Sequence, residues 1–78
     1  MKIRFHADDE RSLTVVFEPW GGQYLLEAGD YLDVLFAPSD REPDGSVEHR
    51  PGTLVLTQEG PGVLRAWNSA GEVLDPAS

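Results

Sequence analysis

Polar and apolar residues alternate along most of this chain in short runs. Ile3 and Phe5 fall on one side of the alternation in residues 2–7, and residues 12–18 repeat the pattern. A period of two residues is typical of a β-strand with one buried face, because successive side chains of a strand point to opposite sides. No window of the sequence shows a convincing helical period. The pattern therefore predicts an all-β protein.

Turn-forming residues separate these runs. Segments rich in Gly, Pro, Asn and Asp recur at short intervals, which is the spacing expected of sandwiches and barrels. Residues 38–45 are the most polar stretch and are expected to form the longest loop. We predict a compact antiparallel β-sandwich or small barrel of seven to eight short strands. The expected strands are residues 2–7, 12–18, 23–27, 31–37, 46–50, 53–58, 62–67 and 72–75.

A single β domain is expected over residues 1–75, with residues 76–78 as a frayed C-terminal tail. The chain has 78 residues. A chain of this size buries only about 60–65% of its unfolded surface, so its margin of stability is thin. The predicted core consists of Ile3, Phe5, Leu13, Val15, Phe17, Leu26, Leu32, Val34, Phe36, Leu54, Leu56, Leu64 and Val73.

The chain is acidic. It has 14 Asp and Glu residues against 6 Lys and Arg residues, which gives a net charge of -8 at pH 7. Phosphate backbones and anionic lipid surfaces repel such a chain, so neither nucleic acid nor a membrane is expected as a partner. The charge leaves open a cationic partner, a bound cation or a well-solvated surface.

Cysteine is absent, so neither a disulfide framework nor a thiolate zinc site supports the core. The amino terminus enters the alternating pattern at once and carries no apolar stretch of the length of a signal peptide or membrane span. These two features predict a cytoplasmic protein.

The main apolar block, residues 13–36, is interrupted once by Glu18-Pro19-Trp20-Gly21-Gly22. Pro and Gly take the backbone out of a strand ladder, so Trp20 is expected in a turn, as a binding platform or as a lid on the core. Aromatic faces stack on sugars and anchor protein interfaces. The candidate ligand- or partner-binding residues are therefore Trp20, Tyr24, Tyr31 and Trp67. In the structural alternative, Trp20 closes one end of the fold and Trp67 packs between the sheets.

The segment Asp40-Arg41-Glu42-Pro43-Asp44-Gly45 resembles the start of a calcium-binding loop, with candidate ligands Asp40, Glu42 and Asp44. The twelfth position of such a loop carries a bidentate Glu, but here it is Pro51. Asp44-Gly45 is also typical of a hairpin turn. The pattern favours an acidic loop without a metal.

Two histidines, His6 and His49, suggest a second kind of metal centre. Together with Glu18 or Glu48 they would make the set of two His and one carboxylate that suits iron in cupin-like proteins. Glu48 and His49 are adjacent in an expected strand, however, and therefore point to opposite faces. Two ordinary surface histidines are the favoured interpretation, and no cofactor is expected.

No residues point to catalysis. The serines lie outside any nucleophile-elbow pattern, and Gly60-Pro61-Gly62 is not followed by the Lys of a phosphate-binding loop. Paired carboxylates such as Asp30 and Asp33 lack the depth of burial that separates the pKa values of an acid and a base. We expect a protein that is not an enzyme.

The string from Leu13 to Gly21, with its Glu-Pro-Trp-Gly turn, resembles a group of short uncharacterised bacterial β proteins. Tyr24, Leu26, Gly29 and a strand around Val34 extend the resemblance, which continues loosely through residues 52–74. It implies a bacterial protein with one β domain. No activity is assigned to that group, so it implies no functional residue.

The expected function is that of a protein-interaction module, with an aromatic-bearing end surrounded by acidic loops that contacts a protein partner. The alternative is a module that binds a small ligand, either a carbohydrate or a metal. A small cupin-like enzyme is the third interpretation.

Overall fold

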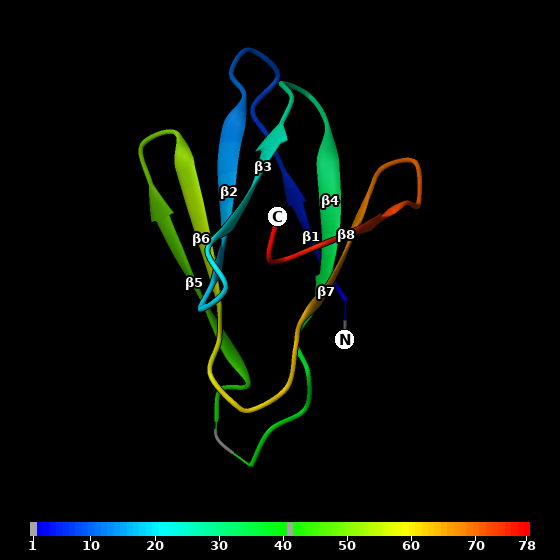
Figure 1. The fold of residues 1–78 in the computed structure, drawn as a ribbon. Coiled ribbons are helices and arrows are strands. Elements are labelled where there is room, and N and C mark those ends of the chain that lie inside the picture. Colours follow the sequence, from blue (N-terminus) through cyan, green and yellow to red (C-terminus); the bar gives the residue numbers. More distant parts are fainter. Residues whose placement is uncertain (1, 41) are drawn as a thin grey trace.

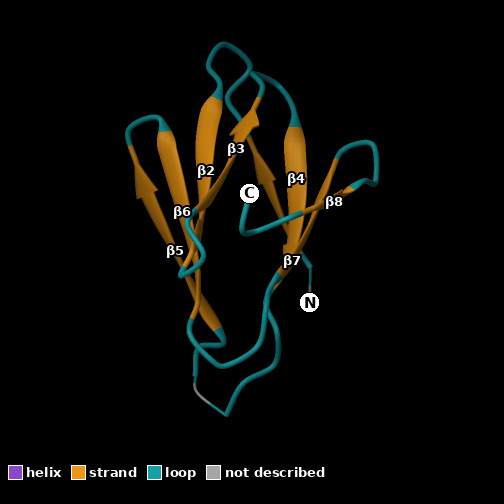
Figure 2. Ribbon diagram, viewed as in Figure 1, coloured by secondary structure: helices purple, strands orange, loops and turns teal. Residues whose placement is uncertain are grey.

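Two four-stranded β-sheets pack against each other in this protein (Figures 1 and 2). The structure is a computed structural model that describes residues 2–40 and 42–78. Its described residues form eight strands and no helix, as the alternating pattern predicts. The strands are β1 (Ile3–His6), β2 (Leu13–Glu18), β3 (Gly22–Leu26), β4 (Tyr31–Leu35), β5 (Gly45–Arg50), β6 (Thr53–Gln58), β7 (Arg65–Asn68) and β8 (Val73–Leu74).

The first sheet has the strand order β1-β4-β7-β8, and the second has the order β3-β2-β6-β5. The expected all-β sandwich is confirmed. One pairing differs from the antiparallel arrangement expected, because β2 and β6 run parallel. Three strands separate them in the chain, and one of these, β4, belongs to the other sheet. Parallel neighbours need such a crossover, whereas local turn residues direct the antiparallel hairpins.

The core lies between the inward faces of the two sheets. Val15 and Phe17 of β2 face Leu32 and Val34 of β4 across this layer, and all four are at most 1% exposed. Leu26, Leu54, Leu56 and Leu64 complete the buried part of the predicted core, while Phe5, Leu13 and Phe36 are partly buried against it.

Two predicted core residues are exposed. Val73 is 68% exposed because it lies opposite Trp67 on the outer face, and its neighbour Leu74 packs on the core instead. Ile3 is 39% exposed although it lies opposite the buried Val34, because β1 is an edge strand that the second sheet covers incompletely. Both predictions were wrong. For Val73 the error is a shift of one residue along the strand, since the neighbouring Leu74 is the side chain that faces the core.

Residues 75–78 run from β8 towards β3 (Figure 1). The Gly22 N–H donates to the Pro76 carbonyl at 2.9 Å, and the Gln23 N–H donates to the Ser78 carbonyl at 3.3 Å. A Cβ atom on Gly22 would collide with the Pro76 carbonyl oxygen, so glycine leaves room for this close approach. Pro76 and Ser78, which belong to the segment expected to fray, are thus hydrogen-bonded to the edge strand β3.

Candidate binding face on the first sheet

A row of four side chains crosses the outer face of the sheet β1-β4-β7-β8. Arg4 on β1 lies opposite Asp33 on β4. Trp67 on β7 lies opposite Asp33 from the other side, and Val73 on β8 lies opposite Trp67. Both chain neighbours of Asp33 are fully buried in the core. Because strand side chains alternate, the row that contains Asp33 faces away from the core.

Cationic side chains lie over the two aromatic rings of this face. Lys2 Nζ is 4.4 Å from the centroid of the Trp67 ring, and Arg65 Cζ is 5.0 Å from it. Arg4 Cζ is 4.0 Å from the centroid of the Tyr31 ring. A cation at such a distance is attracted by the negative face of the ring. Since both rings are partly exposed, the face combines aromatic surface with fixed positive charge.

One ion pair holds the middle of the face. The Arg4 guanidinium donates to both oxygens of the Asp33 carboxylate, with Nε–Oδ1 at 2.8 Å and Nη2–Oδ2 at 3.1 Å. The hydrogen bond with Arg4 lowers the pKa of Asp33, and the charges of Lys2 and His6 act in the same direction against the opposing effect of desolvation. The same pair raises the pKa of Arg4. The pKa of Asp33 is therefore below that of an ordinary Asp.

The sign of the charge on this face is opposite to that of the whole protein. Its strand positions and the preceding Lys2 carry three cations, Lys2, Arg4 and Arg65, and one carboxylate, Asp33. These charges sum to +2, whereas the chain carries -8. In the described residues neither Lys2 nor Arg65 forms an ion pair, so both charges face solvent beside Trp67.

The four aromatic residues singled out from the sequence do not form one plane. Tyr31 and Trp67 lie on the outer face described above, whereas Trp20 and Tyr24 are partly buried and pack against the core. Burial raises the pKa of the Tyr24 phenol, and the carboxylates of Asp30, Glu72 and Glu27 add to the shift. The turn at Trp20 is closed by the Gly21 N–H, which donates to the Phe17 carbonyl at 2.6 Å. Trp20 thus packs against the core from a hydrogen-bonded turn.

Gln58, the last residue of β6, anchors the long acidic loop. It is 4% exposed, and its Oε1 accepts the Ala37 N–H at 2.9 Å. Its Nε2 donates to the carbonyls of Ala37 at 3.1 Å and Asp44 at 3.2 Å. The Asp44 carboxylate accepts the Ser39 N–H at 3.0 Å, so its side chain stabilises the loop.

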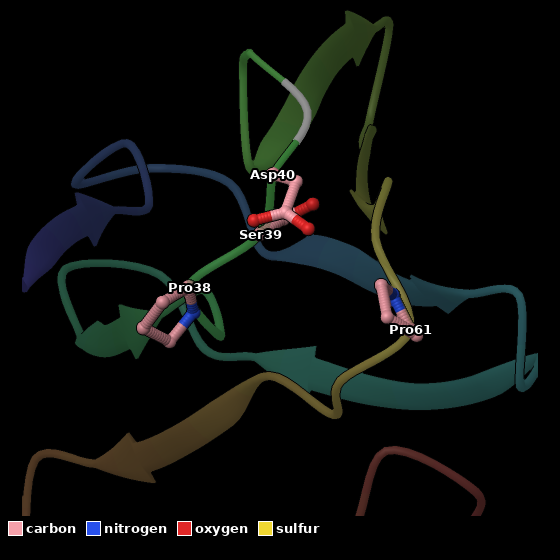
Figure 3. A pocket seen from close by; sticks show the side chains of 4 residues that line it. All are labelled: Pro38, Ser39, Asp40 and Pro61. Carbon is pink, nitrogen blue, oxygen red and sulfur yellow. The ribbon is translucent and has the colours of Figure 1, made fainter.

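The candidate calcium ligands lie in this loop, in which Arg41 is outside the described residues. Asp40 lines a cavity of about 360 Å³, and Figure 3 shows it on one loop segment with Pro61 on the facing segment. Across residues 2–40 and 42–78, no three His, Cys, Asp or Glu side chains are grouped to hold a metal ion. The lining residues are Pro38, Ser39, Asp40 and Pro61.

The two histidines meet at one cleft, although they belong to different sheets. His6 ends β1 and His49 lies near the end of β5, and both line a cleft of about 310 Å³. The carboxylates proposed with them do not line it. Glu48 points away on the other face of β5 and accepts a hydrogen bond from Arg50 Nε at 2.6 Å. The sequence suggests that these two histidines come together, but only the packing of the two sheets shows the cleft that they line.

Sequence reasoning also missed the cations and Val73 on the candidate face. The alternation in residues 2–7 does place Lys2 and Arg4 opposite the core positions, which is a usable signal. It does not show that Lys2 reaches Trp67, since that contact depends on β4 lying between β1 and β7.

No protein-family model, no curated protein and no solved structure matches this chain. Within the part of the chain that the structure describes, no helix has the length and apolar character needed to cross a membrane. The functional argument therefore depends on the geometry of the chain's own residues.

Proposed function

We propose that this protein is a protein-interaction module that docks an acidic segment of a partner protein on the outer face of the sheet β1-β4-β7-β8. It acts by binding and performs no catalysis. The observation that carries the proposal is the position of Trp67, a partly exposed indole between two cations that form no ion pair in the described residues.

The composition of this face supports an interface with a protein. Trp, Tyr and Arg are the residue types most enriched among those that dominate binding energy. Trp67, Tyr31 and Arg65 occur together here, and Val73 adds an apolar side chain that is 68% exposed beside the indole. The rings present apolar surface while their cationic neighbours supply donors to a partner.

Charge supports an acidic partner. Potentials of opposite sign on two surfaces steer their encounter and select partners. The Arg4 charge is already matched by Asp33, whereas those of Lys2 and Arg65 are available to carboxylates of a second protein. The acidic remainder of the chain repels such a partner from the other surfaces, which favours docking on this face.

Fluorescence of Trp67 tests the proposal. A Trp20→Phe variant leaves Trp67 as the only tryptophan of the chain. The probe is a short synthetic peptide rich in Glu and Asp, and the control is a peptide of equal length in which Gln and Asn replace them. We expect a saturable change in Trp67 emission with the acidic peptide, weakened by added salt because screening reduces the attraction.

Two variants make the test specific. Arg65→Glu should weaken binding by at least about tenfold, which corresponds to about 1.4 kcal/mol. Arg50→Glu, on the second sheet, is the matched control and should leave binding unchanged. An equal response to both peptides contradicts the proposal. A response to neutral oligosaccharides and not to the acidic peptide would favour the carbohydrate-binding alternative.

A further inference from the structure

The cleft that contains both histidines lies at one end of the sandwich, beside the Tyr31 end of the face described above, because the His6 and Tyr31 ring centroids are 5.7 Å apart. Its walls come from the segment after β1 and from the turn between β5 and β6. Leu13 contributes an apolar side chain that is partly buried against the core. The lining residues are His6, Asp8, Arg11, Ser12, Leu13, His49, Pro51 and Gly52.

Hydrogen bonds fix both walls of this cleft. The Glu10 N–H donates to Asp8 Oδ1 at 2.9 Å, and the Gly29 N–H donates to the Asp8 carbonyl at 2.9 Å. On the other wall, the Thr14 N–H donates to the Gly52 carbonyl at 3.0 Å. The cleft is therefore largely formed before any ligand enters, which reduces the entropy lost on binding.

The polar side chains of the cleft are mainly donors without a partner. Within the described residues, the side chains of Arg11, Ser12 and His49 make no hydrogen bond or ion pair. Asp8 is the only carboxylate among the lining residues, and one of its oxygens is occupied by the Glu10 N–H. A guanidinium, an imidazole and a hydroxyl therefore line the same cleft as the apolar side chain of Leu13.

We propose that this cleft binds the oxyanion group of a small molecule, either a carboxylate or a phosphate. Arg11 supplies the planar fork of donors that matches such a group, and the His49 imidazole and the Ser12 hydroxyl complete the donor set. The volume of about 310 Å³ lies at the lower end of the range for small-molecule sites.

A metal ion fits this cleft less well. The Arg11 charge repels a cation, and the described residues contain no grouping of three side chains suited to hold one. The donor set and its charge therefore favour an anion at the position where the sequence suggests a metal with two His ligands.

Imidazole NMR of the ¹⁵N-labelled protein tests the proposal directly. Inorganic phosphate and succinate are titrated separately at fixed pH, with sodium chloride used to hold the ionic strength constant. We expect the His6 and His49 signals to shift along one saturable curve with at least one of these probes. The probe that saturates at lower concentration identifies the preferred oxyanion.

Arg11→Gln should weaken this binding by at least about tenfold, because charged hydrogen bonds are the strongest of the set. Arg50→Gln is the matched control and should change the affinity by less than about twofold. Thermal melting of both variants verifies that they fold. Shifts that do not saturate with either probe, or an unchanged affinity in Arg11→Gln, would overturn the proposal. So would saturable Zn²⁺ binding at both histidines without a response to either anion.

Discussion

Lys2 and Trp67 are far apart in the sequence, yet Lys2 Nζ lies 4.4 Å from the centroid of the Trp67 ring. Their strands are separated by β4, so the contact crosses three neighbouring strands of the first sheet. It places the indole and a cation on the same outer face. This relationship joins the two kinds of group, aromatic and cationic, on which the proposed docking face depends.

The Arg4–Asp33 pair predicts a specific pH dependence of stability. The pKa of Asp33 is lowered from its ordinary value of 3.8 in the folded protein by the hydrogen bond with Arg4. A carboxyl group with a lowered folded pKa contributes stability that is present above its unfolded pKa and is lost as pH falls through the folded value. We therefore expect Asp33→Asn to lose less stability than the wild-type protein as the pH falls below about 4.

Arg4→Gln provides the partner variant for that measurement. Because Arg4 is the main cause of the shift, its removal should reduce the same acid-range slope, and the double variant should show little further change. Thermal midpoints measured across the acid range verify this. If the thermal midpoints of the wild-type protein and of Asp33→Asn fell in parallel with pH, the Arg4–Asp33 pair would not be the source of the pH dependence.

Gln58 should be sensitive to substitution although it is polar. Gln58→Leu leaves the Ala37 N–H and the carbonyls of Ala37 and Asp44 without their side-chain partner. Unpaired buried groups of this kind cost about 1–3 kcal/mol each in the free energy of unfolding. Urea denaturation should show a loss of at least about 1 kcal/mol, whereas Thr57→Ala on the outer face should cost less. A loss below about 0.5 kcal/mol would show that the loop does not depend on Gln58.

The core and the outer face should respond differently to truncation. Phe17 is 1% exposed, so Phe17→Ala should cost about 3–5 kcal/mol in the free energy of unfolding. Val73 is 68% exposed, and Val73→Ala should change stability by less than about 0.5 kcal/mol. Val73→Ala should nevertheless weaken the binding of the acidic peptide, since Val73 lies beside Trp67 on the docking face. A large loss of stability in Val73→Ala would show that Val73 is buried in the core and would contradict its place on the outer face.

Gly22 should control the attachment of the C-terminal segment. Gly22→Ala places a methyl group where the Pro76 oxygen lies, so residues 75–78 must move away from β3. We expect faster trimming of the variant by carboxypeptidase and faster amide exchange at Gln23. Gln23→Ala keeps the backbone bond to Ser78 and serves as control. Equal trimming of all three proteins would show that the segment is not held at Gly22.

The sequence predicts the local features of this fold well. Alternation in residues 12–18 and 53–58 identifies β2 and β6, since each has one face in the core. It does not predict that these two strands pair in parallel, because their neighbourhood depends on the intervening strands. The sequence also does not predict the phase of β8, because two residues are too few to show which side chain faces inward.

At the candidate site, too, the sequence predicts the residues of interest but not the contacts between distant strands. The sequence singles out Tyr31 and Trp67 as large aromatic residues with possible binding roles. It does not separate them from Trp20 and Tyr24, since only the sheet order reveals which rings pack on the core. The meeting of His6 and His49 likewise depends on contact between two sheets.

Backbone NMR of the ¹⁵N-labelled protein during titration with the acidic peptide tests the central proposal most directly. We expect saturable amide shifts concentrated in β1, β4 and β7 and at Val73, with little change in β2, β5 and β6. Arg65→Glu should remove the shifts, and Arg50→Glu should keep them. Saturable shifts confined to the second sheet, or no saturable shifts with the folded wild-type protein, would contradict the assignment of the outer face of the first sheet as the docking surface.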